Sequence, residues 1–158
     1  MRELADDTLL QLADSRQFIG LRDGSGDVSR PIRLRPKLPQ SFRLLSGHDA
    51  TALAYVAAGG DGSISMISNV TPDLCQTIFS NLKQGRLQTA RYLQRRLNPL
   101  EASLADGSPA ALKYALSWIG FMRPNTRLPI VQLDEASRAG VAKAIASLDE
   151  ALASAAEA

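Results

Sequence analysis

Along the first 70 residues, short apolar runs alternate with helical patterns. The apolar runs at residues 18–21, 42–46 and 63–67 are each followed closely by glycine, serine or asparagine. Runs this short, bounded by turn residues, are more typical of strands than of helices. Apolar residues recur at helical spacing over residues 4–13 and 49–58, which predicts a helix in each place.

From Thr71 onward the pattern predicts helices only. Thr71-Pro72-Asp73 is a strong helix start, because a hydroxyl can cap the first turn and proline is favoured there, and Gly85 is a suitable stop. Further helices are predicted over residues 87–105, with an interruption at Asn98-Pro99, from Ser108-Pro109 onward, and over residues 134–156.

Three short strands separated by helices are typical of a parallel sheet with helical crossovers. Such a sheet needs neighbours at its edges and cover on both faces, and a closed (β/α)₈ barrel needs eight strands and about 250 residues. The sequence therefore predicts an α/β fold that forms part of something larger. Residues 1–70 form its β/α units and residues 71–158 its helical region, within one continuous domain.

Composition narrows the class of protein. The chain has 158 residues, of which 45% are hydrophobic, with a net charge of +2 and one cysteine. This charge is too small to indicate nucleic acid or an anionic membrane as partner. One cysteine cannot form an internal disulfide, and no stretch approaches the roughly 20 apolar residues that cross a bilayer. With no signal-peptide pattern at the start, we expect a cytoplasmic globular chain.

Three segments together resemble the dihydrodipicolinate synthase and N-acetylneuraminate lyase family of pyruvate-dependent aldolases. Residues 19–27 (IGLRDGSGD) are similar to that family's sixth strand, IGLKDATGD. Residues 44–50 (LLSGHDA) are similar to its strand-seven motif LLSGDDA, and residues 59–70 (GGDGSISMISNV) to its eighth strand, GGxGVISVTANV. Lys113 and Arg127-Leu128-Pro129 also match the family's C-terminal helical region.

The resemblance implies a partial (β/α)₈ TIM barrel, with equivalents of strands six to eight followed by the C-terminal helical region. Nothing in the chain resembles strands one to five. The resemblance to dihydrodipicolinate synthases implies a lyase of lysine biosynthesis that condenses pyruvate with an aldehyde such as aspartate semialdehyde through a Schiff base, without a cofactor. The resemblance therefore implies pyruvate or another keto acid as the small-molecule partner.

Arg22 stands where the family has its Schiff-base lysine. Imine formation needs an amine that can lose its proton, whereas a guanidinium stays protonated and is a poor nucleophile. The four lysines are predicted outside the strands: Lys37, Lys83, Lys113 and Lys143. Arg22 has two interpretations, a non-covalent partner for a carboxylate, or a relic position that is solvated or paired with an acid such as Asp23. By resemblance, Gly47 and Ile64 are pyruvate-contacting positions.

Two functions follow from these residues. The first is a truncated dihydrodipicolinate-synthase-like lyase that is catalytically impaired by itself. The alternative is a non-catalytic pseudoenzyme or interaction subunit that pairs with a separately encoded N-terminal half. Because uncovered strand edges and an uncovered barrel interior favour association, we expect either self-association or such a half-barrel partner.

Other features indicate structural roles. His48 is interpreted as a partly solvated loop histidine and Cys75 as a small core residue, and a single histidine with a single cysteine leaves no soft-metal site. The basic segment 30–43 contains no acidic residue, and we expect a solvated crossover surface rather than a nucleic-acid site. Residues 59–62 match no phosphate-loop pattern.

Overall fold

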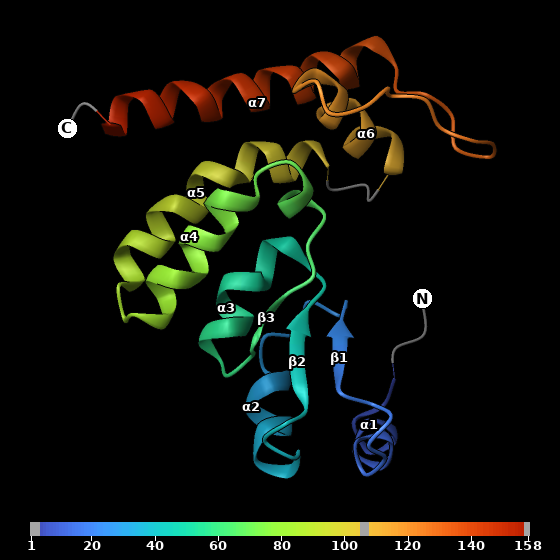
Figure 1. Ribbon diagram of the computed structural model, residues 1–158, viewed down its shortest axis with the longest axis vertical. Helices are drawn as coiled ribbons and strands as arrows, with labels where there is room; N and C mark the ends of the chain where they lie inside the picture. Colours follow the sequence, from blue (N-terminus) through green and yellow to red (C-terminus); the bar gives the residue numbers. More distant parts are fainter. Residues whose placement is uncertain (1–3, 105–107, 157–158) are drawn as a thin grey trace. The chain divides into compact units, whose positions relative to one another are not determined.

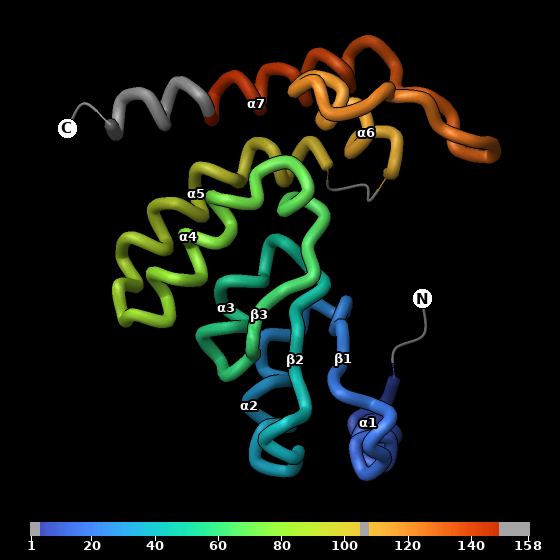
Figure 2. Tube along the Cα trace, viewed as in Figure 1, coloured from blue at the N-terminus to red at the C-terminus, as the bar shows by residue number. Residues whose placement is uncertain are grey.

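The computed structural model describes residues 4–104 and 108–156, with side chains up to residue 148 (Figures 1 and 2). Contacts between Cα atoms divide the chain into two compact units. Unit 1 comprises Met1–Ser65 and Leu82–Gly85, and unit 2 comprises Met66–Asn81 and Arg86–Ala158.

Unit 1 contains a three-stranded parallel sheet in the order β1-β2-β3 (Figure 1). Its strands are β1 (Gly20–Asp23), β2 (Arg43–Ser46) and β3 (Gly62–Ser63). The predicted parallel sheet is confirmed, but two strand boundaries were wrong. β1 begins two residues later than expected. β3 has only two residues, Gly62 and Ser63, which pair with Leu45 and Ser46 of β2, and Ile67 lies in the 3₁₀ helix η3 (Ile67–Asn69).

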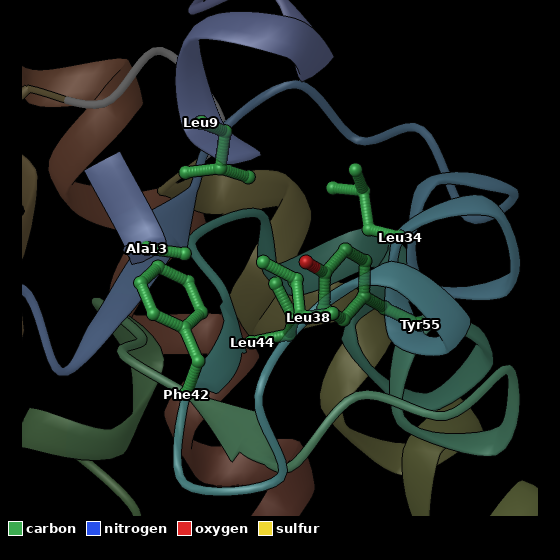
Figure 3. Packing of buried hydrophobic residues seen from close by; sticks show 7 residues of the cluster. All are labelled: Leu9, Ala13, Leu34, Leu38, Phe42, Leu44 and Tyr55. Carbon is green, nitrogen blue, oxygen red and sulfur yellow. The ribbon is translucent and has the colours of Figure 1, made fainter. Parts of the chain in front are cut away.

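Helices cover one face of this sheet and form the core of unit 1. The helical segments are α1 (Asp6–Ala13), α2 (Arg30–Leu34), η1 (Arg35–Lys37), η2 (Asp49–Thr51) and α3 (Ala52–Ala57). The core cluster in Figure 3 consists of buried residues from these helices, from β2 and from the segment before β2: Leu9, Ala13, Leu34, Leu38, Phe42, Leu44 and Tyr55. Side chains alternate across a strand, so Leu44 is buried in this core while Arg43 beside it is exposed.

Unit 2 is helical apart from its connecting segments. It contains α5 (Leu87–Ser103), α6 (Pro109–Trp118) and α7 (Glu135–Ala156), and α7 packs against both α5 and α6. Most of α4 (Pro72–Lys83) also belongs to this unit. Buried side chains at helical spacing explain the packing of α7, where Val141, Ile145 and Leu148 share one face.

Two predictions about the helices of unit 2, the start of α6 and an interruption of α5, can be compared with the structure. Ser108 caps α6 as expected, since its side-chain oxygen accepts a hydrogen bond from the Ala110 amide at 3.2 Å. The expected interruption at Asn98-Pro99 was wrong, because α5 continues through Pro99. Proline removes one helical hydrogen bond, but Leu97 and Leu100 on either side are fully buried, and their packing holds the helix together.

Candidate active site at the carboxyl ends of the strands

Arg22 lies on the sheet face opposite the core of unit 1. It is the third residue of β1 and pairs in register with Leu45 of β2. Its side chain is exposed, and its Nη2 donates a hydrogen bond to the carbonyl oxygen of Gly47 at 3.0 Å. Within the described part of the chain Arg22 has no ion-pair partner. The guanidinium is therefore anchored at one edge, and its charge is not neutralised by the protein.

Gly47 provides the space in which the Arg22 guanidinium lies. A Cβ atom built on Gly47 would approach the Arg22 Cζ to 2.8 Å and its Nη1 to 2.9 Å. Contacts below 3.0 Å are essentially absent for real Cβ atoms, so any other residue would displace the arginine. The structure thus brings together two of the three residues that the sequence singled out.

Ile64 completes the row at the carboxyl ends of the strands. It follows β3 directly, and its amide donates to the carbonyl oxygen of Ser46 at 2.8 Å. Its side chain is 49% exposed. Because Ser46 pairs with Ser63, Ile64 is the neighbour of Gly47 across the sheet. Arg22, Gly47 and Ile64 thus come from three adjacent strands, at the end of a parallel sheet where barrel enzymes place their sites.

Asp23 does not pair with Arg22. It points to the other face of β1, as alternation along a strand requires, and it is 2% exposed. Its carboxylate accepts hydrogen bonds from Arg30 Nη1 at 3.2 Å, from the Tyr55 hydroxyl at 3.2 Å and from the Ser25 amide at 3.1 Å. Burial, together with the Asp23 carboxylate, raises the pKa of Tyr55. This buried polar cluster holds the end of β1 in place, and it could not be predicted from the sequence because Asp23 and Tyr55 lie far apart in the chain.

The four arginines of the basic segment 30–43 all form ion pairs. Arg33 and Arg43 are exposed, in line with the expectation of a solvated surface, whereas Arg30 is buried and Arg35 is half-buried, so the expectation was wrong for those two. The acids that pair with Arg30, Arg33, Arg35 and Arg43 lie outside the segment: Asp6, Asp23, Asp27 and Asp61. These ion pairs could not be predicted from the sequence, because the acids lie outside the segment and meet its arginines only in the folded structure.

Two of those acids have lowered pKa values. Hydrogen bonds from the hydroxyl and the amide of Ser29 lower the pKa of Asp27 to about 2. Burial works to raise the pKa of Asp61, but the hydrogen bond from the Leu44 amide and the guanidinium groups of Arg43 and Arg35 lower it overall. The Asp61 carboxyl is therefore stabilised in its charged form. Its hydrogen bond from the Leu44 amide and its ion pair with Arg43 link the start of β3 to β2.

The residues around His48 do not form a nucleophile and base pair. The Ser46 hydroxyl donates to the His48 carbonyl at 3.1 Å, whereas the His48 Nδ1 lies 3.2 Å from the Thr51 hydroxyl. The imidazole is exposed and lies against Gly26, where a built Cβ would approach it to 3.5 Å. His48 is thus a loop histidine, as the sequence suggested.

The remaining chemistry-bearing residues lie away from this row. None of the four lysines is in a strand: Lys37 lies in η1, Lys83 in α4, Lys113 in α6 and Lys143 in α7. Cys75 is a buried free thiol. Among residues 4–104 and 108–148, whose side chains are described, no group of three or more metal-binding side chains comes together. No helix in the described part of the chain is long and apolar enough to cross a membrane.

A parallel sheet with helical crossovers is consistent with part of an α/β barrel, in which sites lie at the carboxyl ends of the strands. The chain belongs to the dihydrodipicolinate synthetase family, whose family model matches residues 2–148. The curated relatives it matches include the 4-hydroxy-tetrahydrodipicolinate synthase of Gluconobacter oxydans, 36% identical over 143 residues. That of Acidiphilium cryptum is 39% identical over 142 residues.

Solved structures agree with this family. The 4-hydroxy-tetrahydrodipicolinate synthase of Methylacidiphilum fumariolicum SolV superposes with a TM-score of 0.88 at 29% identity, covering 95% of this chain and 51% of that one. The dihydrodipicolinate synthase of Thermotoga maritima has a TM-score of 0.83 at 27% identity, covering 91% and 50%. The two curated relatives are matched over 48% and 49% of their lengths, for 90% and 89% of this chain. The chain spans about half the length of the relatives it matches.

Proposed function

We propose that this chain is a non-catalytic member of the family that forms no Schiff base at the end of β1. In this proposal β1, β2 and β3 are equivalent to barrel strands six to eight, and residues 71–158 to the last barrel helix and the C-terminal helical region. The observation that carries it is the guanidinium of Arg22, held on the carbonyl of Gly47 where the resemblance puts the family's lysine.

The chemistry at this position supports the proposal. A Schiff base requires a deprotonated amine, and the guanidinium of arginine stays protonated and delocalised in proteins. The side-chain amines that could replace the family's lysine are those of the four lysines, none of which lies on a strand. Lys113 lies in α6, where its amine donates to the Asn125 carbonyl at 2.9 Å. The family reaction, condensation of pyruvate with aspartate semialdehyde, therefore lacks its nucleophile in this chain.

Borohydride trapping tests this directly. The purified chain is incubated with pyruvate and borohydride, and its intact mass is measured, with lactate as the control that has no keto group. We expect no specific adduct, while circular dichroism confirms that the protein is folded. A stoichiometric adduct mapped to one lysine would refute the proposal, because it would reveal a relocated nucleophile.

One observation favours a second candidate, non-covalent binding of a keto acid at Arg22. Its guanidinium is exposed and without an ion-pair partner among the described residues, and the geometry of guanidinium suits a carboxylate. Calorimetric titration with pyruvate should then show binding that Arg22→Gln removes and Arg16→Gln keeps, since Arg16 is an exposed arginine outside the site. Binding that is unchanged in Arg22→Gln would contradict this candidate.

The partner in this proposal is either a second copy of the chain or a separate polypeptide that supplies the other half of the barrel. The exposed face around Arg22 supports it, since Gly20 and Arg43 are exposed there and Ile64 is half exposed. Both outer strands of the sheet also have one edge without a strand neighbour in the described structure. Light scattering over a concentration series tests self-association, and a mass that stays monomeric throughout would leave only the second polypeptide as partner.

A further inference from the structure

Unit 2 contains a cavity that has no part in the candidate active site. Its volume is about 380 Å³, and it lies between the beginning of α4, the middle of α5, the end of α6 and the last described side chains of α7. Its walls are mainly apolar and include Leu93, Ile119 and Ile145. This volume is at the lower end of the range for small-molecule sites, roughly 300 to 1,000 Å³.

The polar side chains of the cavity present acceptors. Thr77 uses its hydroxyl proton to donate to the Asp73 carbonyl at 2.8 Å, and Thr71 donates to the Ile67 carbonyl at 3.4 Å. Asp73 is the one charged residue among those that line the cavity, all of which are described. A ligand that matches this lining needs hydrogen-bond donors and a positive charge at one end, and an apolar body at the other.

We propose that this cavity binds a small primary amine with an apolar body, such as a short alkyl chain or a single ring. The ammonium group lies at Asp73, and the body packs between Leu93, Ile119 and Ile145. Arg96 of α5 favours the same orientation of the ligand. Its Nη2 donates to the carbonyl of Leu148 at 3.2 Å, so a positive charge lies near the side of the cavity that Leu148 lines. Like charges repel, so the ammonium group points away from Arg96 and toward α4.

The test compares three probes on the full chain by isothermal titration calorimetry: hexylamine, 1-hexanol and methylamine. Hexylamine carries both features, hexanol keeps the apolar body without the charge, and methylamine keeps the charge with almost no body. We expect hexylamine to bind up to about fivefold more tightly than hexanol, as a charge pair with the exposed Asp73 allows, and methylamine to give no measurable binding. Fluorescence of Trp118, the one tryptophan of the chain, gives a second readout because it directly precedes Ile119.

Asp73→Asn should remove the preference for hexylamine and leave the affinity for hexanol unchanged. Glu135→Gln is the matched control, because Glu135 is an exposed acid in the first turn of α7 and does not line the cavity. Both variants lose a favourable charge at a helix start, so any general effect on stability is shared. Equal affinity for hexylamine and hexanol, no saturable heat with hexylamine, or an unchanged preference in Asp73→Asn would each overturn the proposal.

Discussion

Replacing Gly47 with alanine tests whether the Arg22 guanidinium lies where the structure places it. The new Cβ would approach Arg22 Cζ to 2.8 Å and would force the guanidinium away from the sheet. Gly60→Ala is the matched comparison, because its Cβ would approach Cδ1 of Tyr55 to 2.5 Å and the Tyr55 carbonyl oxygen to 2.9 Å. Neither glycine has a positive φ, so the backbone angle φ does not disfavour alanine at either position, and the two substitutions differ only in what the new Cβ meets.

The two substitutions should differ in their effect on the free energy of unfolding. Arg22 is exposed and flexible, so Gly47→Ala loses one hydrogen bond worth about 1 kcal/mol, and water replaces it. Restricting the unfolded chain returns about 0.4 to 1 kcal/mol, which leaves a change near zero. Tyr55 is 1% exposed and cannot move aside, so Gly60→Ala should overpack the core and destabilise unit 1 by about 2 kcal/mol.

Urea unfolding followed by circular dichroism measures both changes, and a double mutant isolates the contact. In the Arg22→Ala background the obstacle is gone, so Gly47→Ala should become stabilising by about 0.4 to 1 kcal/mol. If Gly47→Ala costs as much as Gly60→Ala, or if its effect is the same with and without Arg22, then the guanidinium does not lie over Gly47.

Three further results are expected from the polar clusters of unit 1. Tyr55→Phe removes a donor from the buried Asp23 carboxylate and should cost about 1 to 2 kcal/mol in urea unfolding, whereas no change would mean that the hydrogen bond does not form. The lowered pKa of Asp61 means that its contribution is present above its ordinary pKa of 3.8 and is lost as the pH falls through the lowered value. The stability difference between wild type and Asp61→Asn should therefore shrink on acidification, and a difference that grows would contradict this sign. Ser29→Ala removes the hydroxyl and keeps the amide donor, so it should raise the pKa of Asp27 from about 2 part of the way toward 3.8 in a carboxyl NMR titration, and an unmoved pKa would show that the Ser29 hydroxyl is not its cause.

Much of the architecture could be predicted from local patterns. Short apolar runs and the turns that end them indicated three parallel strands, and Ser108-Pro109 marked the start of α6. These features depend on residues that are neighbours in the chain, so the sequence contains the information directly. The boundaries of β3 and the continuity of α5 through Pro99 were missed, since pairing with β2 and packing in unit 2 outweigh local preference there.

For the candidate site, the residue types at the strand ends could be read directly from the sequence, including an arginine where imine chemistry needs a lysine. The contacts that those residues make depend on the folded chain. Because side chains alternate along β1, Arg22 lies on the exposed face and Asp23 on the buried one. There Arg30 and Tyr55 donate hydrogen bonds to the Asp23 carboxylate. Asp23 and Tyr55 are far apart in the chain and meet only when β1 and α3 pack together, because a buried carboxylate must find donors wherever the fold brings them.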